Sequence, residues 1–213
     1  MTAIPFHQEI FYPESDGQPM AESDLHRKEM TYLIEALGEH FAQEAAVYVA
    51  GNLFLYFKKG DPRSVVAPDL MVVKGVAKGD RKVFKLWEEG RQPCLVVEVT
   101  SDSTQDEDLS KKKTIYERLG VEEYFLFDPL GDYLNPRLQG YHLVRGRYAR
   151  ARPETDGSLV SRTTGVTFRI EGTRIRLVAA GRLLPRYEES EARNRALEEE
   201  NALLRAELER MRA

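Results

Sequence analysis

Two acidic residues interrupt segments of the chain that otherwise have the composition of buried β-strands. Glu98 lies within PCLVVEV (93–99), and Asp69 follows a proline in VVAPDLMVV (65–73). A buried carboxylate is costly unless it is paired with a cation or bound to a metal. Two carboxylates that converge can hold a hard divalent ion such as Mg²⁺. The alternatives are a turn aspartate and a solvent-facing or ion-paired glutamate.

A lysine lies on the apolar side of the segment that follows this second strand. SDSTQDEDLSKKKTIYERLG (101–120) has acids early and ends at Gly120, which predicts a helix. Its inward stripe is Leu109, Lys112, Ile115, Tyr116 and Leu119. Beside a metal, Lys112 would orient or activate water and stabilise charge developing on a phosphate. It can instead extend to solvent, and Lys111 and Lys113 compete for the role.

The preceding part of the chain predicts one helix and then strands. Apolar residues recur at helical spacing over 23–43, and Ser23 followed by Asp24 is typical of a helix start. The segments 45–57 and 65–73 alternate or run apolar and are rich in β-branched and aromatic residues, which indicates strands.

Further along, 74–93 is basic and contains glycine, which predicts a long loop, or a loop with a short helix around Trp87. VEEYFLFDP (121–129) predicts a strand, and short strands with turns follow to about residue 180. This order of helix, strands and strand–helix–strand predicts an α/β or α+β sheet with helices packed on it.

The last segment, 185–213, contains neither glycine nor a β-branched residue. Leucine or methionine recurs every seven residues, which places these residues at heptad positions d: Leu197, Leu204 and Met211. Positions a are then Asn194, Asn201 and Leu208. Residues of opposite charge face each other across a parallel pair: Arg193 with Glu198, Glu200 with Arg205, and Glu207 with Arg212. We expect a homodimer through a coiled coil over 186–212; the alternative is a lone solvated helix.

Composition bounds the remaining possibilities. The 213 residues, 42% hydrophobic and 31% charged, suit one soluble domain with some additional polar length. The start has no leader-like pattern and no window resembles a membrane span, which predicts a cytoplasmic protein without a membrane partner. Cys94, the one cysteine, excludes an internal disulfide, and its apolar strand favours core packing over a reactive thiol.

The net charge of −4 means that any nucleic-acid binding must rely on local basic patches. One patch, in 74–93, contains Lys78, Arg81 and Lys82. The other, PRLQGYHLVRGRYARARP (136–153), includes Arg145 and Arg147 and has interleaved tyrosines. Both are candidates for phosphate contacts, and the alternative for the second is the solvated face of a hairpin.

Taken together, several short motifs resemble the Uma-type branch of the PD-(D/E)XK nuclease superfamily. They are Pro68-Asp69, Leu95-Val-Val-Glu98-Val, Ser103-Thr104, Asp108, Lys112, Tyr116, Gly120-Val121, Glu123-Tyr124 and Asp128-Pro129. The resemblance covers about residues 10 to 180. It implies a restriction-endonuclease-like α/β fold, with a central mixed β-sheet flanked by helices, and Mg²⁺-dependent phosphodiester hydrolysis. Asp69 then matches the aspartate of the PD motif, and Glu98 matches the second acid.

The chain departs from the superfamily pattern at one position. The superfamily has a lysine two residues after the second acid, where this chain has Thr100. In the similar branch a lysine on the next helix stands at the place of Lys112. The superfamily often adds an acid from the first helix, for which Glu22 is the candidate, with His26 one turn on as a weaker substrate-binding candidate. An ordinary helix-start acid and a packed or solvated histidine are the alternatives.

We therefore expect a nuclease domain over 1–182 and a coiled-coil helix over 183–213. The leading hypothesis is a DNA endonuclease that uses Mg²⁺, or alternatively Mn²⁺, held by Asp69 and Glu98, with Lys112 as the migrated catalytic lysine; RNA remains open as a substrate. The rival is a catalytically inactive nuclease-fold binding or assembly module that dimerises through its coiled coil. Thr100 and the acidic net charge favour this rival.

Overall fold

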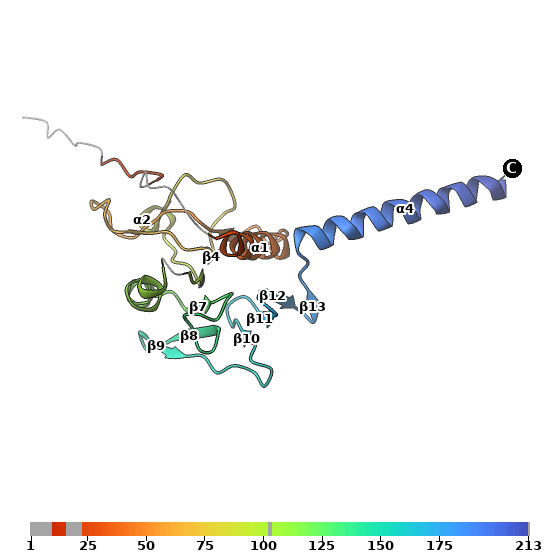
Figure 1. Ribbon diagram of the computed structural model, residues 1–213. Coiled ribbons are helices and arrows are strands. Elements are labelled where there is room, and N and C mark those ends of the chain that lie inside the picture. The colour runs from red at the N-terminus through yellow and green to blue at the C-terminus, as the bar shows by residue number, and fades with distance from the viewer. Residues whose placement is uncertain (1–9, 16–22, 102–103, 213) are drawn as a thin grey trace, which may run out of the picture.

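A central six-stranded sheet organises the computed structural model, which describes residues 10–15, 23–101 and 104–212 (Figure 1). In spatial order its strands are β1 (Val47–Ala50), β4 (Leu70–Lys74), β6 (Leu95–Val99), β7 (Glu123–Phe127), β8 (Leu138–Val144) and β9 (Arg147–Arg150). β6 and β7 are parallel and the other neighbours are antiparallel. The predicted mixed sheet is therefore confirmed.

Two smaller sheets accompany the central one. The four-stranded sheet consists of β10 (Leu159–Val160), β11 (Val166–Glu171), β12 (Arg174–Ala179) and β13 (Arg182–Leu183). The three-stranded sheet consists of β3 (Val65–Val66), β2 (Leu55–Tyr56) and β5 (Phe84–Lys85). The short helix α2 (Leu86–Glu89) follows β5 and contains Trp87, so the second of the two alternatives for this segment is correct.

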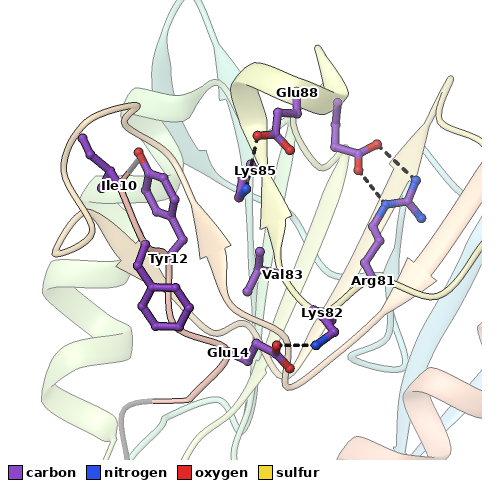
Figure 2. Close-up of a pocket in the computed structure, with 10 residues that line it drawn as sticks. Ile10, Tyr12, Glu14, Arg81, Lys82, Val83, Lys85 and Glu88 are labelled. Carbon is purple, nitrogen blue, oxygen red and sulfur yellow. Dashed lines mark hydrogen bonds and ion pairs between the residues drawn. The ribbon is translucent and has the colours of Figure 1, made fainter. Parts of the chain in front are cut away.

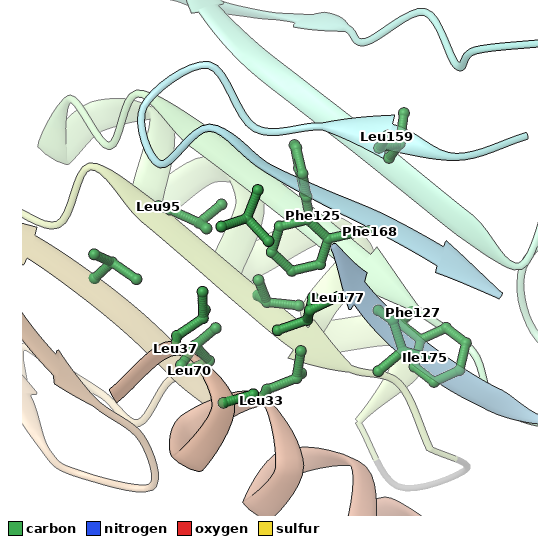
Figure 3. Packing of buried hydrophobic residues seen from close by; sticks show 14 of the residues in the cluster. Leu33, Leu37, Leu70, Leu95, Phe125, Phe127, Leu159, Phe168, Ile175 and Leu177 are labelled. Carbon is green, nitrogen blue, oxygen red and sulfur yellow. The ribbon is translucent and has the colours of Figure 1, made fainter. Parts of the chain in front are cut away.

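The first helix, α1 (Asp24–His40), begins where the sequence predicts. The Ser23 hydroxyl accepts a hydrogen bond from the His26 backbone N–H at 3.1 Å, which caps the helix. Its apolar face packs between the central and four-stranded sheets, where Leu33 and Leu37 are fully buried (Figure 3). Each buried leucine stabilises the fold by about 1.5–3 kcal/mol. This packing fixes the first turn of α1 near one end of the central sheet.

The connection from β6 to β7 carries the second predicted helix. It consists of a π-helical turn, η1 (Glu107–Lys112), continued by α3 (Lys113–Leu119), and it ends at Gly120 with a positive φ of 78°. The predicted C-cap is confirmed, because this left-handed conformation favours glycine. The predicted inward stripe needs one correction: Leu109 is exposed and Asp108 is buried in its place.

The last helix, α4 (Tyr187–Arg212), projects away from the other helices and strands and runs toward the C-terminus (Figure 1). None of its described residues is buried. Its apolar residues at heptad positions are exposed: Leu197, Leu204, Leu208 and Met211. Across the described part of the chain, no helix combines the length and the apolar character required to cross a membrane.

Candidate active site

The two predicted acids lie side by side at one end of the central sheet. β4 and β6 pair antiparallel with Leu70 opposite Val97, so one residue further on Asp69 faces Glu98. The Asp69 backbone N–H donates to Glu98 Oε2 at 3.3 Å, and the Val99 N–H donates to Asp69 Oδ2 at 2.7 Å. The register of two neighbouring strands therefore brings together acids that are 29 residues apart.

A glycine makes room for this end of the sheet. A Cβ atom on Gly51 would lie 2.0 Å from the carbonyl oxygen of Asp69 and 2.5 Å from Cδ1 of Ile34. The next residue, Asn52, donates its backbone N–H to the carbonyl of Pro68 at 2.8 Å. The chain after β1 therefore passes against the backbone of the first acid, and only glycine fits there without displacing it.

Lys112 reaches the same point from η1. Its Nζ lies 3.0 Å from Glu98 Oε2 and 2.9 Å from Asp108 Oδ1, and its side chain is 12% exposed. The neighbouring lysines are engaged elsewhere. Lys111 is 69% exposed and pairs with Glu107, and the Lys113 ammonium lies over the Tyr141 ring. Of the three lysines, the structure brings only Lys112 to the two acids.

Tyr116, one turn after Lys112, completes the surroundings of Glu98. Its hydroxyl donates to Glu98 Oε1 at 2.7 Å, so both carboxylate oxygens of Glu98 have partners. Burial raises the pKa of Glu98 to about 8, and the positive charge of Lys112 opposes that rise. Burial also opposes the charge on Lys112, but the carboxylates of Glu98 and Asp108 outweigh it and raise the Lys112 pKa above its ordinary value. Lys112 therefore favours the ionised form of Glu98, but burial is the larger effect and leaves the pKa of Glu98 raised.

The helix α1 contributes a histidine to the other acid. His26 Nε2 lies 3.2 Å from Asp69 Oδ2, and the histidine is buried. The structure thus places a weaker substrate-binding candidate in direct contact with a predicted metal ligand. Glu22, the predicted acid from this region, lies outside the described residues.

The donor set fits a hard divalent cation. Among the described residues there is no cluster of three or more histidine, cysteine, aspartate or glutamate ligands arranged for a metal. Mg²⁺, however, is commonly held by one or two carboxylates, with waters and substrate phosphates completing its shell. Asp69 and Glu98 supply those two carboxylates. Thr100, on the same strand face as Glu98, adds a buried hydroxyl that has no hydrogen-bond partner in the part of the chain described.

Comparison with known proteins identifies the family of the chain. A model of the Uma2 family, described as "Putative restriction endonuclease", matches residues 2–173, which is most of the chain. The chain belongs to the Uma2 family. This confirms the resemblance predicted from its motifs.

One solved structure similar to this Uma2 chain is the crystal structure of "a putative nuclease belonging to DUF820" from Anabaena variabilis ATCC 29413. The TM-score is 0.51, and the match covers 71% of this chain and 82% of that chain. At 14% sequence identity, this likeness supports the fold alone. No curated protein matches the chain.

The basic candidates of 74–93 lie in other surroundings in this Uma2 chain. Lys78 donates to the carbonyls of Phe41 and Ala42 just after the end of α1. Since His26 is in the first turn, Lys78 is about 22 Å along the helix axis from the acids. The structure therefore does not bring Lys78 to the site.

Arg81 and Lys82 line a pocket of about 640 Å³ between the segment 10–14 and β5 (Figure 2). Each is paired with an acid that also lines the pocket: Arg81 with Glu89, and Lys82 with Glu14. The Arg81 guanidinium also lies over an aromatic ring, 4.2 Å from its centroid. These ion pairs neutralise the positive charge of Arg81 and Lys82, the charge on which their prediction as phosphate-binding residues depended.

Arg145 and Arg147 lie at the turn between β8 and β9, and both are exposed. Arg147 pairs with Glu117 of α3 at 3.0 Å, through a side chain that is 85% exposed. Exposed pairs of this kind are weak and exchange readily with other anions. This hairpin is therefore the better placed of the two predicted basic patches to contact a polyanion.

The sequence analysis did not predict how three residues of the candidate site contact the others. Asp108 and Tyr116 entered only as parts of a motif or stripe, and the contact of His26 with Asp69 was not predicted. One signal was available: Asp108, Lys112 and Tyr116 are spaced four residues apart, which places them on one face of a helix. An acid and a lysine on a buried face are expected to neutralise each other.

Proposed function

We propose that this chain is a divalent-metal-dependent DNA endonuclease, with its metal held by Asp69 and Glu98. The observation that carries the proposal is the 3.0 Å contact between Lys112 and Glu98, directly beside Asp69. Three residues from separate parts of the chain meet at one end of the sheet, in the order that the family resemblance implies. Family membership supports a nuclease, and the metal, the residue roles and the DNA substrate belong to this proposal.

Each residue has a distinct role in the proposed reaction. A bound Mg²⁺ would supply Lewis-acid stabilisation of the phosphate and a lowered pKa for a bound water. Lys112 holds a positive charge beside the phosphate oxygens, where negative charge develops in the transition state. Tyr116 and the Val99 N–H fix the carboxylate orientations of Glu98 and Asp69. The exposed Arg145 and Arg147 would contact the phosphate backbone. The protein would act in the cytoplasm, and these arginines would attract DNA although the net charge of the chain is negative.

The test combines metal binding with DNA cleavage. Mg²⁺ and Mn²⁺ are titrated by calorimetry into the wild type, Asp69→Asn and Glu98→Gln, and plasmid nicking is measured on the same samples. We expect metal binding and nicking in the wild type and the loss of both in each variant. Folded wild type that neither binds metal nor nicks DNA would refute the proposal. RNA is tested in parallel, and cleavage of RNA without cleavage of DNA would mean that RNA is the substrate.

The lysine assignment has a matched control on the same turn. Lys112→Met should lower the nicking rate by about 10²–10³-fold, whereas Lys111→Met should leave it unchanged, because Lys111 is mostly exposed. The DNA-binding part is tested by salt: affinity should fall steeply as salt rises, with a smaller slope in Arg145→Ala/Arg147→Ala. A flat salt response would contradict phosphate binding by this surface.

We further propose that two copies of the chain pair through α4 over residues 186–212. The exposed seven-residue repeat of apolar side chains, and the opposite charges at facing g and e positions, support a parallel two-stranded coiled coil. The full chain should scatter light as a dimer. Glu200→Arg should weaken the dimer by opposing Arg205 of the second copy, and adding Arg205→Glu should restore it. A monomeric wild type would overturn this pairing.

The same helix is the observation that favours the rival function. An assembly module would need α4 and would not need the acids. Dimerisation without metal binding, and without cleavage of DNA or RNA, would favour that module. In that case Glu98→Gln should leave stability equal or higher, because burial of the acid is costly without a metal.

A further inference from the structure

Asp108 is a buried acid that the proposed reaction does not yet use. It lies on η1, one turn before Lys112, and its Oδ1 is 2.9 Å from Lys112 Nζ. The same ammonium is 3.0 Å from Glu98 Oε2. Lys112 is therefore held between two carboxylates, one from β6 and one from its own helical turn.

Glu98 and Asp108 differ in how well each can hold Lys112 once a metal ion is bound. If Glu98 serves as a metal ligand, the cation neutralises the charge of its carboxylate, so Glu98 attracts Lys112 less strongly. The cation would also repel the Lys112 ammonium. A lysine held by Glu98 alone would then lose its anchor and extend to solvent. Asp108 lies on the helical turn and does not need to leave Lys112.

The charge balance supports the same assignment. With His26 neutral and all three carboxylates ionised, as a bound cation would favour, Asp69, Glu98 and Asp108 with Lys112 sum to −2, which one divalent cation cancels. Without Asp108 the sum would be −1, and the loaded site would carry an excess positive charge in a buried position. A buried excess charge is costly, and expelling Lys112 would be the simplest way to remove it.

We propose that Asp108 is the positioning residue that keeps Lys112 in the active site when Glu98 binds metal. The inference rests on the proposed function, but the holding of Lys112 can be tested without metal or DNA. Glu98→Gln removes the charge of Glu98 while Asp108 remains. Asp108→Asn does the reverse, and the double variant removes both anchors.

The experiment measures acetylation of individual lysines by acetic anhydride in metal-free buffer, with peptide mass spectrometry. We expect Lys112 to remain protected in the wild type and in Glu98→Gln. In the double variant it should react at least about tenfold faster, because no buried ion pair must open first. Lys111 serves as the exposed reference, and circular dichroism shows whether the double variant is folded.

Two results would overturn the proposal. Fast acetylation of Lys112 in Glu98→Gln would show that Asp108 does not hold it. Persistent protection in the folded double variant would show that something else does. If the double variant unfolds, Asp108→Asn alone is compared with the wild type as Mg²⁺ is added: Lys112 should become reactive only in the variant. Equal protection in both, with metal bound, would refute the role.

Kinetics give a second readout that a merely structural role would not produce. Asp108→Asn should lower the nicking rate about 10–100-fold, as removal of supporting partners of a site does. Because Asp108 acts through Lys112, Asp108→Asn/Lys112→Met should be no slower than Lys112→Met alone. Losses that multiply would contradict the proposal. Wild type that does not nick refutes the proposed function, and the acetylation pattern still decides the role of Asp108.

Discussion

A buried glutamate on α1 ties three elements together, and its removal should destabilise the whole chain. Glu29 Oε1 accepts from Arg174 at 2.8 Å, and Oε2 accepts from the Ile175 N–H at 2.8 Å and from Arg186 at 2.7 Å. Arg174 begins β12, and Arg186 directly precedes α4. The Arg186 guanidinium also lies 4.0 Å from the centroid of the Tyr32 ring.

The magnitude follows from what each donor can do after Glu29→Ala. Arg174 is 39% exposed and regains water, so its loss adds little. The buried Ile175 N–H loses its acceptor, which costs about 1–3 kcal/mol. Arg186, 12% exposed, loses a charged partner worth about 1.5–3 kcal/mol. We therefore expect a loss of about 3–5 kcal/mol, the range measured when one partner of a buried ion pair is removed.

Urea unfolding of the wild type and the variants measures this directly. Glu29→Gln retains one carbonyl acceptor, so it should lose less than Glu29→Ala. Asp24→Ala is the matched control on the same helix, because the Asp24–Arg27 pair is exposed and its removal should leave the unfolding midpoint unchanged. A loss below about 1 kcal/mol in Glu29→Ala would refute the reasoning, since a buried ionic anchor must cost more when broken.

Three further predictions concern glycines and a turn acid. Gly51→Ala should destabilise the protein by about 1–3 kcal/mol and weaken metal binding, because its Cβ meets the Asp69 backbone. Gly38→Ala, in the last turn of α1 with open space around a Cβ, should instead stabilise by up to about 0.5–1 kcal/mol; equal effects in urea unfolding would contradict both. Burial opposes the charge of Asp128, but four backbone N–H donors outweigh it and lower the Asp128 pKa. Its stabilisation should be complete above the unfolded pKa of about 3.9 and be lost as pH falls through the lower folded value. Asp128→Asn should flatten the unfolding free energy across that acidic window, and an unchanged pH profile would count against the four-donor turn.

Much of the fold could be predicted because it depends on local patterns. Ser23 caps the start of α1, Gly120 caps the end of α3, and the apolar run around Glu98 forms strand β6 of the central sheet. The sequence predicts short strands in this part of the chain, but not that β10, β11, β12 and β13 form a sheet of their own. Nothing local indicates that residues 159–183 pack on α1, because that contact depends on burial of apolar side chains distant in sequence.

The residues of the candidate site were predicted in part, and the buried acids that were missed share a physical cause. Asp69, Glu98 and Lys112 were found because an acid or a lysine among apolar residues violates the expected pattern. Glu29 and Asp108 violate it equally, but each lies beside other charged residues in the sequence and looks like part of a solvated face. Their burial follows from helix phase, which the π-helical turn shifts in η1.

The basic patch of 74–93 does not converge on the candidate site, for a related reason. Sequence shows that a residue is charged, but not whether another residue neutralises it. In the sequence the acid beside Arg81 and Lys82 is Asp80, yet in the fold Arg81 pairs with Glu89 of α2 and Lys82 with Glu14 of the N-terminal segment (Figure 2). Net local charge is thus a property of the folded surface. A stretch of arginine and lysine predicts phosphate binding only when the strands and helices packed against it bring no carboxylates of their own.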